Sequence, residues 1–216
     1  MKKTINLEYL LSIPDDYNQK ANMDYPLVLF LHGMGERGSD LNAVKANGLP
    51  KLAEEQNFPF ILVSPQCPLG VERYSTWLLH IDSIYALLED LITQYRVDED
   101  RIYVTGLSMG GYGTWEIVKQ HPEKFAAMAP ICGGGSVEHL ERLKDVPVWA
   151  FHGAKDDVVP MEESQVMVEA LRSAGGNVKL TIYPEATHDS WTETYNDPAF
   201  YTWLLNQKRA KGRIIK

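Results

Sequence analysis

The feature that most constrains the fold of this chain is a run of residues that is apolar at every position. The run covers Tyr25–Leu31, and His32 and Gly33 follow it directly. A strand with one face in water alternates apolar and polar residues, whereas a strand covered on both faces is apolar throughout. The run therefore predicts a buried strand in a sheet that carries helices on both faces.

Short apolar runs of this kind alternate with helix-length amphipathic stretches along the rest of the chain. This alternation predicts a doubly wound α/β fold with a mainly parallel sheet. We expect further strands at 58–64, 101–105, 125–131, 146–151 and 178–183, with one or two more inside 5–13. We expect helices at 78–95, 108–120, 198–208 and between Pro160 and Gly175. In such a sheet the chemistry lies beyond the carboxyl ends of the strands.

Length and charge narrow the classes of partner. The 216 residues contain no repeat and no linker, which predicts a single domain over residues 1–216. The net charge of −8, with no basic stripe before the tail, argues against a nucleic-acid partner. No apolar run is long enough for a bilayer, so no membrane partner is expected. Asn6 and Glu8 interrupt the segment that a signal peptide would need apolar, which favours a cytoplasmic location.

A candidate nucleophile follows the predicted strand at 101–105. Gly106–Gly110 matches the pattern G-x-S-x-G, with a strand before it and a helix after it. A sharp strand-to-helix turn strains the serine backbone and exposes its hydroxyl, and glycines two residues away on each side remove Cβ atoms that would collide there. The pattern therefore indicates Ser108 as a nucleophile.

A serine hydroxyl needs a base, and the base needs an acid that orients it. Asp156 and Asp157 both follow the predicted strand at 146–151, and His188 follows the strand at 178–183. The order serine, acid, histidine is the one this architecture requires. The residues alone leave the choice between the two aspartates open.

Main-chain amides are the expected donors to a developing oxyanion. We assign this role to the N–H groups of Met109, next to the nucleophile, and of Met34, in the loop after the first long strand. Trp77 and Trp191 are candidate substrate-binding aromatics, because rings at the mouth of a cleft stack on sugars or phenols; packing between loops is the alternative.

For several other polar residues we expect a structural role. Glu36 and Arg37 are expected to pair and fix the shape of the neighbouring loop, while His32 and His152 are expected to hydrogen-bond locally. Zinc-protease and phosphate-loop motifs are absent from the sequence, so no metal and no cofactor is expected. Two cysteines do not make a disulfide scaffold, and both are predicted to be buried free thiols.

These motifs resemble the α/β-hydrolase superfamily, and more narrowly its small carboxylesterases related to dienelactone hydrolase, acyl-protein thioesterase and the predicted peptidases of the prolyl-oligopeptidase group. The motifs that carry the resemblance are 31–37, 64–68, 106–111, 152–156 and 188–191. The resemblance implies a twisted, mainly parallel sheet of about eight strands, and no metal or organic cofactor.

The same resemblance refines individual residues. The His-Gly-x-x-Asp pattern selects Asp156 as the acid. The implied strand order puts Cys67 and Cys132 three strands apart, beyond the reach of a disulfide. The segment 136–145, where relatives carry lids, has room for only one short helix, so we expect a site with at most a minimal lid.

The leading hypothesis is a serine carboxylesterase that works through an acyl-enzyme on a small-molecule or carbohydrate-linked ester. The alternatives, in order, are a carbohydrate acyl esterase for acetyl or feruloyl groups, and a thioesterase or peptidase. A hydrolase-fold binding protein without catalysis is the alternative from another class.

Overall fold

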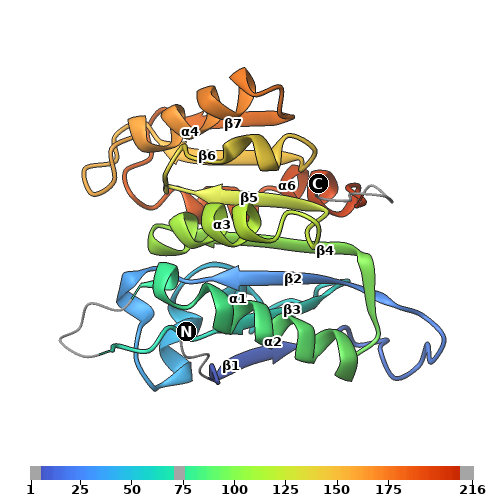
Figure 1. Cartoon of the computed structure of the whole chain (residues 1–216). Helices are drawn as coiled ribbons and strands as arrows, with labels where there is room; N and C mark the ends of the chain where they lie inside the picture. The colour runs from blue at the N-terminus through green and yellow to red at the C-terminus, as the bar shows by residue number, and fades with distance from the viewer. Residues whose placement is uncertain (1–5, 71–75, 210–216) are drawn as a thin grey trace.

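The computed structural model describes residues 6–70 and 76–209, and seven strands of this part form one sheet (Figure 1). Their order across the sheet is β1-β3-β2-β4-β5-β6-β7. Only β1 is antiparallel to its neighbour β3, and the other neighbouring pairs are parallel. The strands are β1 Tyr9–Ser12, β2 Tyr25–Leu31, β3 Ile61–Pro65, β4 Val97–Leu107, β5 Ala127–Ile131, β6 Val148–Gly153 and β7 Val178–Tyr183.

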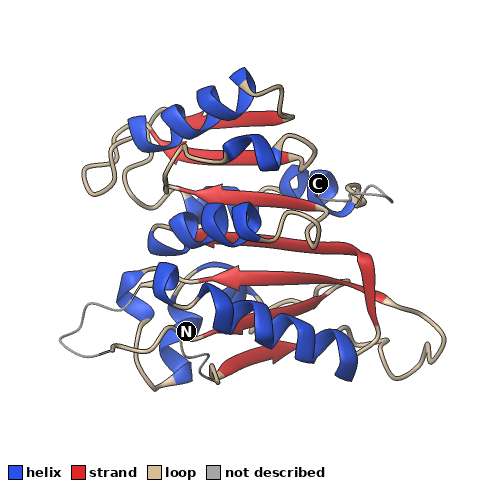
Figure 2. Ribbon diagram, in the orientation of Figure 1, coloured by secondary structure: helices blue, strands red, loops and turns tan. Residues whose placement is uncertain are grey.

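Helices cover both faces of this sheet (Figure 2). One face packs against α2 Ile81–Gln94, α3 Met109–Gln120 and α4 Glu162–Ser173. The other face packs against α1 Gly48–Leu52, α5 Trp191–Asn196 and α6 Pro198–Leu205. Short 3₁₀ helices complete the connections, namely η1 Met34–Glu36, η2 Leu41–Ala46, η4 Trp77–Leu79 and η5 Leu140–Leu143.

The central strand β2 shows why the apolar run had to be continuous. Leu27, Leu29 and Leu31 belong to the core on the α2 side, whereas Val28 and Phe30 belong to the core on the α1 side. Successive side chains of a strand point to opposite faces, so a strand between two layers of helices needs apolar residues at both parities. All seven residues of β2 are buried.

The predicted α/β fold is confirmed, with differences at several element ends. The expected strand at 101–105 is the middle of the longer β4, and the expected helix at 78–95 divides into η4 and α2. The segment 5–13 supplies one strand within the described residues, so the described sheet has seven strands where about eight were expected. The short helices α1 and α5 were not predicted, because five or six residues carry too little periodicity.

The segment 136–145 contains only η5, as expected for a site without a large lid. Cys67 and Cys132 are both buried free thiols, and they follow β3 and β5, which are three strands apart. Within the described residues, no helix combines the length and the apolar character that crossing a membrane requires.

Candidate active site

The parallel strands bring the predicted site residues to one edge of the sheet. Ser108 follows the end of β4, Asp156 lies three residues after β6, and His188 lies five residues after β7. Because β4, β5, β6 and β7 are parallel neighbours, their carboxyl ends lie side by side, although the three residues are far apart in the sequence.

Ser108 occupies a strained turn between β4 and α3. Its backbone has φ 53° and ψ −118°, a conformation with positive φ that residues with a side chain rarely adopt. The N–H of Ser108 donates to the carbonyl of Ile131 at 3.0 Å, and its own carbonyl accepts the N–H of Tyr112 at 3.2 Å. These two bonds hold the backbone of the turn in place.

The glycines around Ser108 let α3 approach the sheet very closely. A Cβ placed on Gly110 would lie 1.9 Å from the carbonyl oxygen of Leu31, and one on Gly106 would lie 2.5 Å from the carbonyl oxygen of Gly110. Both neighbours are backbone atoms, which cannot turn away as a side chain can. The predicted reason for the G-x-S-x-G pattern is therefore confirmed as a matter of space.

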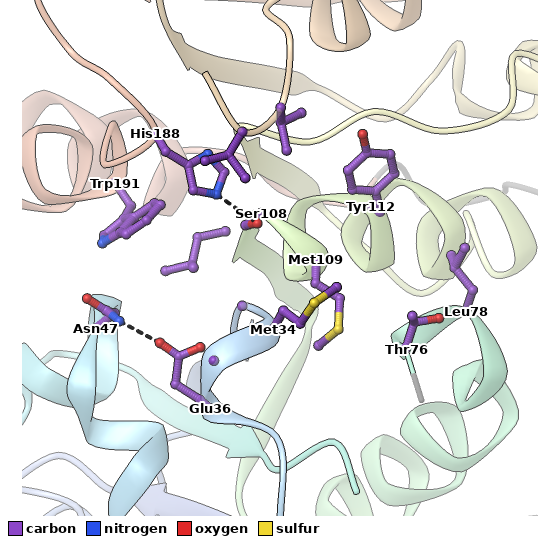
Figure 3. A pocket seen from close by; sticks show the side chains of 15 residues that line it. Met34, Glu36, Asn47, Thr76, Leu78, Ser108, Met109, Tyr112, His188 and Trp191 are labelled. Atoms are coloured by element: carbon purple, nitrogen blue, oxygen red, sulfur yellow. Dashed lines mark hydrogen bonds between the residues drawn. The ribbon is translucent and has the colours of Figure 1, made fainter. Parts of the chain in front are cut away.

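Ser108, His188 and Asp156 form a continuous chain of hydrogen bonds, of which Figure 3 shows the one between His188 and Ser108. The Nε2 atom of His188 lies 2.9 Å from Oγ of Ser108, and its Nδ1 atom lies 2.8 Å from Oδ2 of Asp156. Since an ionised carboxylate only accepts, Nδ1 carries the proton and Nε2 is free to accept the hydroxyl proton. This is the arrangement of a serine with its base and its orienting acid.

Asp156 is held as an anion. Burial acts to raise the pKa of its carboxyl, but the hydrogen bond from His188 and the N–H groups of Val159 and Val158 together keep that pKa below its ordinary value. Both amides donate to Oδ1 at 2.9 Å. The alternative acid, Asp157, is exposed, and Asp156 is the aspartate that the structure places against His188.

Backbone contacts connect the loop of the acid to the loop of the histidine. The N–H of Ala154 donates to the carbonyl of Tyr183 at 2.9 Å, and that of Lys155 donates to the carbonyl of Ala186 at 3.0 Å. A Cβ on Gly153 would lie 2.2 Å from the carbonyl oxygen of Thr187. The glycine of the His-Gly-x-x-Asp pattern therefore allows the two loops to pack together.

Met34 and Met109 are each the first residue of a helix, η1 and α3 respectively. Amides in the first turn of a helix have no partner within that helix and remain able to donate. Both methionines line the cavity in front of Ser108 (Figure 3). Their role as the two donors to an oxyanion stays a prediction.

His32 holds the loop that carries Met34. Its Nδ1 atom donates to the carbonyl of Gly33 at 2.6 Å, and its Nε2 atom accepts the N–H of Cys67 at 3.0 Å. These partners define one neutral tautomer, and burial lowers the pKa of His32, which favours the neutral ring. The predicted local hydrogen bonding of this histidine is confirmed.

The prediction that Trp77 binds substrate is wrong. Its side chain is fully buried, its Nε1–H donates to the carbonyl of His32 at 2.9 Å, and its ring lies 4.9 Å from the His32 ring. A large ring with one polar atom is placed where that atom finds a partner, and here the partner belongs to the interior. Trp77 therefore supports the loop of Met34 from inside.

The expected pair between Glu36 and Arg37 is also replaced by other contacts. The buried carboxylate of Glu36 accepts the side-chain amide of Asn47 at 2.5 Å, and Arg37 donates to the carbonyl of Met34 at 2.9 Å. Gln66 donates to the main-chain carbonyl of Glu36 at 2.8 Å. The loop is thus fixed as expected, but through the contacts of Glu36 with Asn47 and Gln66 outside the loop and the contact of Arg37 with Met34 inside it.

A cavity of about 620 Å³ opens in front of the Ser108 hydroxyl. Trp191 lines it, and the Trp191 ring meets the His188 ring edge-on, with 5.3 Å between the centroids. The predicted contact of Trp191 with substrate stays a prediction. The other lining residues beyond the serine, the histidine and the two methionines are Gly33, Gly35, Glu36, Asn47, Thr76, Leu78, Leu107, Tyr112, Val158 and Val159.

Several of these lining residues were missed by the sequence analysis. Tyr112 lies four residues after Ser108 on α3, and i,i+4 spacing on a helix places both on one side. That spacing could have identified it. Burial, followed by the neighbouring Glu163, raises the pKa of Tyr112 to about 12, so its hydroxyl is protonated in the cavity. Nothing in the sequence pattern singles out Asn47 or Leu78.

The described residues contain one group of three side chains that could ligate a metal ion, and it coincides with this site. One ligand atom each from Cys132, Asp156 and His188 lies within 4.8 Å of the others. Burial raises the pKa of the Cys132 thiol to about 12, so the sulfur keeps its proton. Asp156 and His188 already share a hydrogen bond, so the group matches a proton-transfer chain better than a metal site.

Comparisons with known proteins agree with this geometry. Residues 73–210 match the Dienelactone hydrolase family. A solved thermostable esterase is 38% identical, with a TM-score of 0.79 over 93% of this chain and 59% of its own. A probable feruloyl esterase C from Aspergillus niger is 26% identical over 87% of this chain and 69% of its own length.

A bifunctional acetylxylan esterase/xylanase, XynS20E from Neocallimastix patriciarum, is 29% identical over 68% of this chain but only 22% of its own length. The chain thus spans about a fifth of that enzyme and about three fifths of the thermostable esterase. The family match covers well over half of the residues, including Ser108, Asp156 and His188. The chain therefore belongs to the dienelactone hydrolase family and has the α/β-hydrolase fold.

Proposed function

We propose that this protein is a serine carboxylesterase that hydrolyses neutral carboxylic esters through an acyl-enzyme intermediate. The observation that carries the proposal is the hydrogen-bonded chain from Oγ of Ser108 through His188 to Asp156, which opens into a cavity with mostly apolar walls. Membership of a hydrolase family and the likeness to a solved esterase support it.

The mechanism follows from the positions of the protons. Nε2 of His188 takes the proton of Ser108 as Oγ attacks the ester carbonyl, and the imidazolium then gives that proton to the leaving alcohol. Asp156 keeps the histidine in the required tautomer and balances its charge. The N–H groups of Met34 and Met109 receive the oxyanion. In the second half, His188 activates a water molecule that releases the acid and frees Ser108.

The cavity favours a neutral substrate. Its apolar walls suit an aliphatic or aromatic group, and its described lining residues include the carboxylate of Glu36 but neither a lysine nor an arginine. Among these described residues, a carboxylate group on the substrate would lose hydration, would find no cation as partner and would meet a like charge. We expect neutral aryl and alkyl esters to be preferred over esters that carry a free acid.

A carbohydrate acyl esterase is the second candidate. The observation that favours it is Trp191, whose ring lies beside His188 at the cavity and is suited to stacking on a sugar or a phenolic ring. The names of the relatives from Neocallimastix and Aspergillus, an acetylxylan esterase and a feruloyl esterase, point the same way. Thioester and peptide hydrolysis use the same groups and rank below it.

A panel of substrates tests these proposals. We expect hydrolysis of 4-nitrophenyl esters, with kcat/KM lowered about 10⁴-fold or more in Ser108→Ala. Ser136→Ala, at an exposed serine in the loop that contains η5, is the matched control. An organophosphonate should label the wild-type protein and the control but not Ser108→Ala. No hydrolysis above the Ser108→Ala level would refute the carboxylesterase, and labelling without turnover would instead support a binding protein.

The same panel separates the substrates. Higher kcat/KM on acetylated xylan fragments or methyl ferulate than on simple alkyl esters would favour the carbohydrate acyl esterase, and a preference for acyl thioesters or proline peptides would favour the lower alternatives. The cytoplasmic location stays a prediction, which fractionation of the native cells would test.

A further inference from the structure

His152 stands directly behind the acid of the proposed triad. It is the fifth of the six residues of β6, and its ring is completely buried. Its Nε2 atom lies 3.2 Å from Oδ2 of Asp156 and 2.9 Å from the carbonyl oxygen of Val159. The Val159 carbonyl can only accept, so Nε2 carries a proton and donates it there, and Oδ2 of Asp156 lies within reach of the same N–H.

The other nitrogen of the same ring anchors it to two further elements. Nδ1 lies 2.7 Å from the hydroxyl of Ser164 on α4, and that hydroxyl lies 2.9 Å from the carbonyl oxygen of Gly133, just after β5. Ser164 is itself buried. The ring is therefore held from both sides, by the loop after β6 on one side and by β5 and α4 on the other.

The environment of Asp156 shows what this ring contributes. Oδ1 accepts only main-chain amides, those of Val158 and Val159. Oδ2 faces two imidazoles, with Nδ1 of His188 at 2.8 Å and Nε2 of His152 at 3.2 Å. The His188 side chain keeps a fifth of its surface exposed, whereas that of His152 has none. Of the two rings, His152 is the more deeply buried.

We propose that His152 is a positioning residue for the hydrolysis reaction. By donating its Nε2–H to Oδ2 of Asp156 and to the Val159 carbonyl, it holds the loop 153–159 closed and keeps Oδ2 directed at Nδ1 of His188. This inference rests on the proposed function of the triad. His152 touches neither substrate nor reacting atoms and acts only through Asp156.

Val159 gives the same histidine a second effect. The Val159 side chain lines the substrate cavity, and its main-chain N–H and C=O groups bind Asp156 and His152 respectively. The contacts of Val159 with Asp156 and His152 therefore hold both the acid and this part of the cavity wall. When the Nε2 donor is lost, the orientation of His188 should change first, because Val159 keeps its bond to Asp156.

Two substitutions separate the role of the Nε2 proton from that of packing. In His152→Gln the side-chain amide reaches about as far as Nε2 and still donates to Asp156, whereas in His152→Asn it reaches only as far as Nδ1. The hydrolysis rate of each variant is divided by the number of active sites that an organophosphonate labels in that variant. We expect His152→Gln to keep kcat within about threefold, and His152→Asn to lose about tenfold or more with KM changed less than threefold, since a hydrogen bond to a charged group is removed.

A control and a spectroscopic readout complete the test. His121→Gln serves as control, because His121 stacks on Tyr85 with 3.9 Å between the ring centroids and lies outside the site. In proton NMR, we expect the downfield resonance of the His188 Nδ1–H to shift in His152→Asn and to stay near its wild-type position in His152→Gln. Equal loss in both variants, or an unchanged kcat and resonance in His152→Asn, would overturn the proposal.

Wild-type protein alone supplies an independent check, which applies even where neither variant folds. Nitrogen-15 NMR of the histidine rings should show a proton on Nε2 of His152, and an unprotonated Nε2 would overturn the proposal. These NMR measurements need no substrate. Failure of the wild type to hydrolyse any ester would thus count against the proposed function, whereas the state of His152 would be decided separately.

Discussion

Replacing Gly110 by alanine tests whether close packing under α3 positions Ser108, the proposed nucleophile. The added Cβ would lie 1.9 Å from the Leu31 carbonyl oxygen and 2.9 Å from that of His32, whereas protein Cβ atoms essentially never come closer than 3.0 Å to such neighbours. The start of α3 must therefore move away from β2 by roughly 1 Å, carrying Ser108 and Met109 with it. Both contacts are with backbone, so no side-chain rotation can relieve them.

The displacement has two measurable effects. Overpacking at a rigid site costs about 1–3 kcal/mol of unfolding free energy, and for a chain of this length each kcal/mol lowers Tm by about 2–4 °C. A misplacement of roughly 1 Å between reacting groups lowers the rate by about 100-fold. We expect Gly110→Ala to show both effects, with the larger part of the rate loss in kcat.

The assay compares thermal unfolding and kcat/KM on a 4-nitrophenyl ester, with rates normalised to the folded fraction. Gly135→Ala is the matched control, because its Cβ would meet only the flexible end of Met167 at 3.3 Å and the Cβ of Trp115 at 3.6 Å. Wild-type Tm and wild-type kcat/KM in Gly110→Ala would refute the argument that this glycine is required by the approach of α3 to β2.

Three further predictions follow from the site. Asp156→Asn should lower kcat about 10⁴-fold by favouring the wrong tautomer of His188, whereas Asp157→Asn, at the exposed neighbour, should keep near wild-type activity. Similar losses of ester hydrolysis in the two variants would contradict the assignment of Asp156 as the acid. Trp77→Phe should lower the unfolding free energy in urea by about 1–3 kcal/mol, since the buried His32 carbonyl loses its donor, and an unchanged stability would show that this bond contributes nothing. Folding lowers the pKa of Asp156, so the ionised carboxylate contributes fully to stability above the unfolded pKa of about 3.9, and this contribution is lost as the pH falls through the lower folded pKa. In urea titrations, the difference in unfolding free energy between wild type and Asp156→Asn should therefore shrink below about pH 4. A difference that stays constant with pH would contradict this linkage.

The strands and the order of the site residues were predictable because both depend on patterns within short segments. The continuous apolar run of β2 needs only its seven residues to indicate burial on two faces. Ser108 stands in a local glycine pattern, and His188 and Asp156 follow recognisable strands. A parallel sheet then places all carboxyl ends at one edge, so strand position alone predicts that the three approach one another.

The predictions that failed concern the direction in which a side chain points. Trp77 was expected in the cavity, but its neighbours Thr76 and Leu78 line the cavity while Trp77 points into the core. The 3₁₀ helix η4 has only three residues, too few for a periodicity in the sequence that relates position to direction. His152 shows the same limit, since local hydrogen bonding was foreseen but contact with the Asp156 carboxylate was not.

The amino-acid sequence by itself determined the α/β class, the strand-to-helix turn that carries Ser108, and the order of Ser108, Asp156 and His188 along the chain, because each of these features is contained in short segments of the sequence. The tertiary structure decided which aspartate faces His188, that Asn47 reaches Glu36, and which side chains enclose the cavity. Those outcomes depend on distances between loops that close packing sets only once α3 lies against the sheet, and no short segment contains that information.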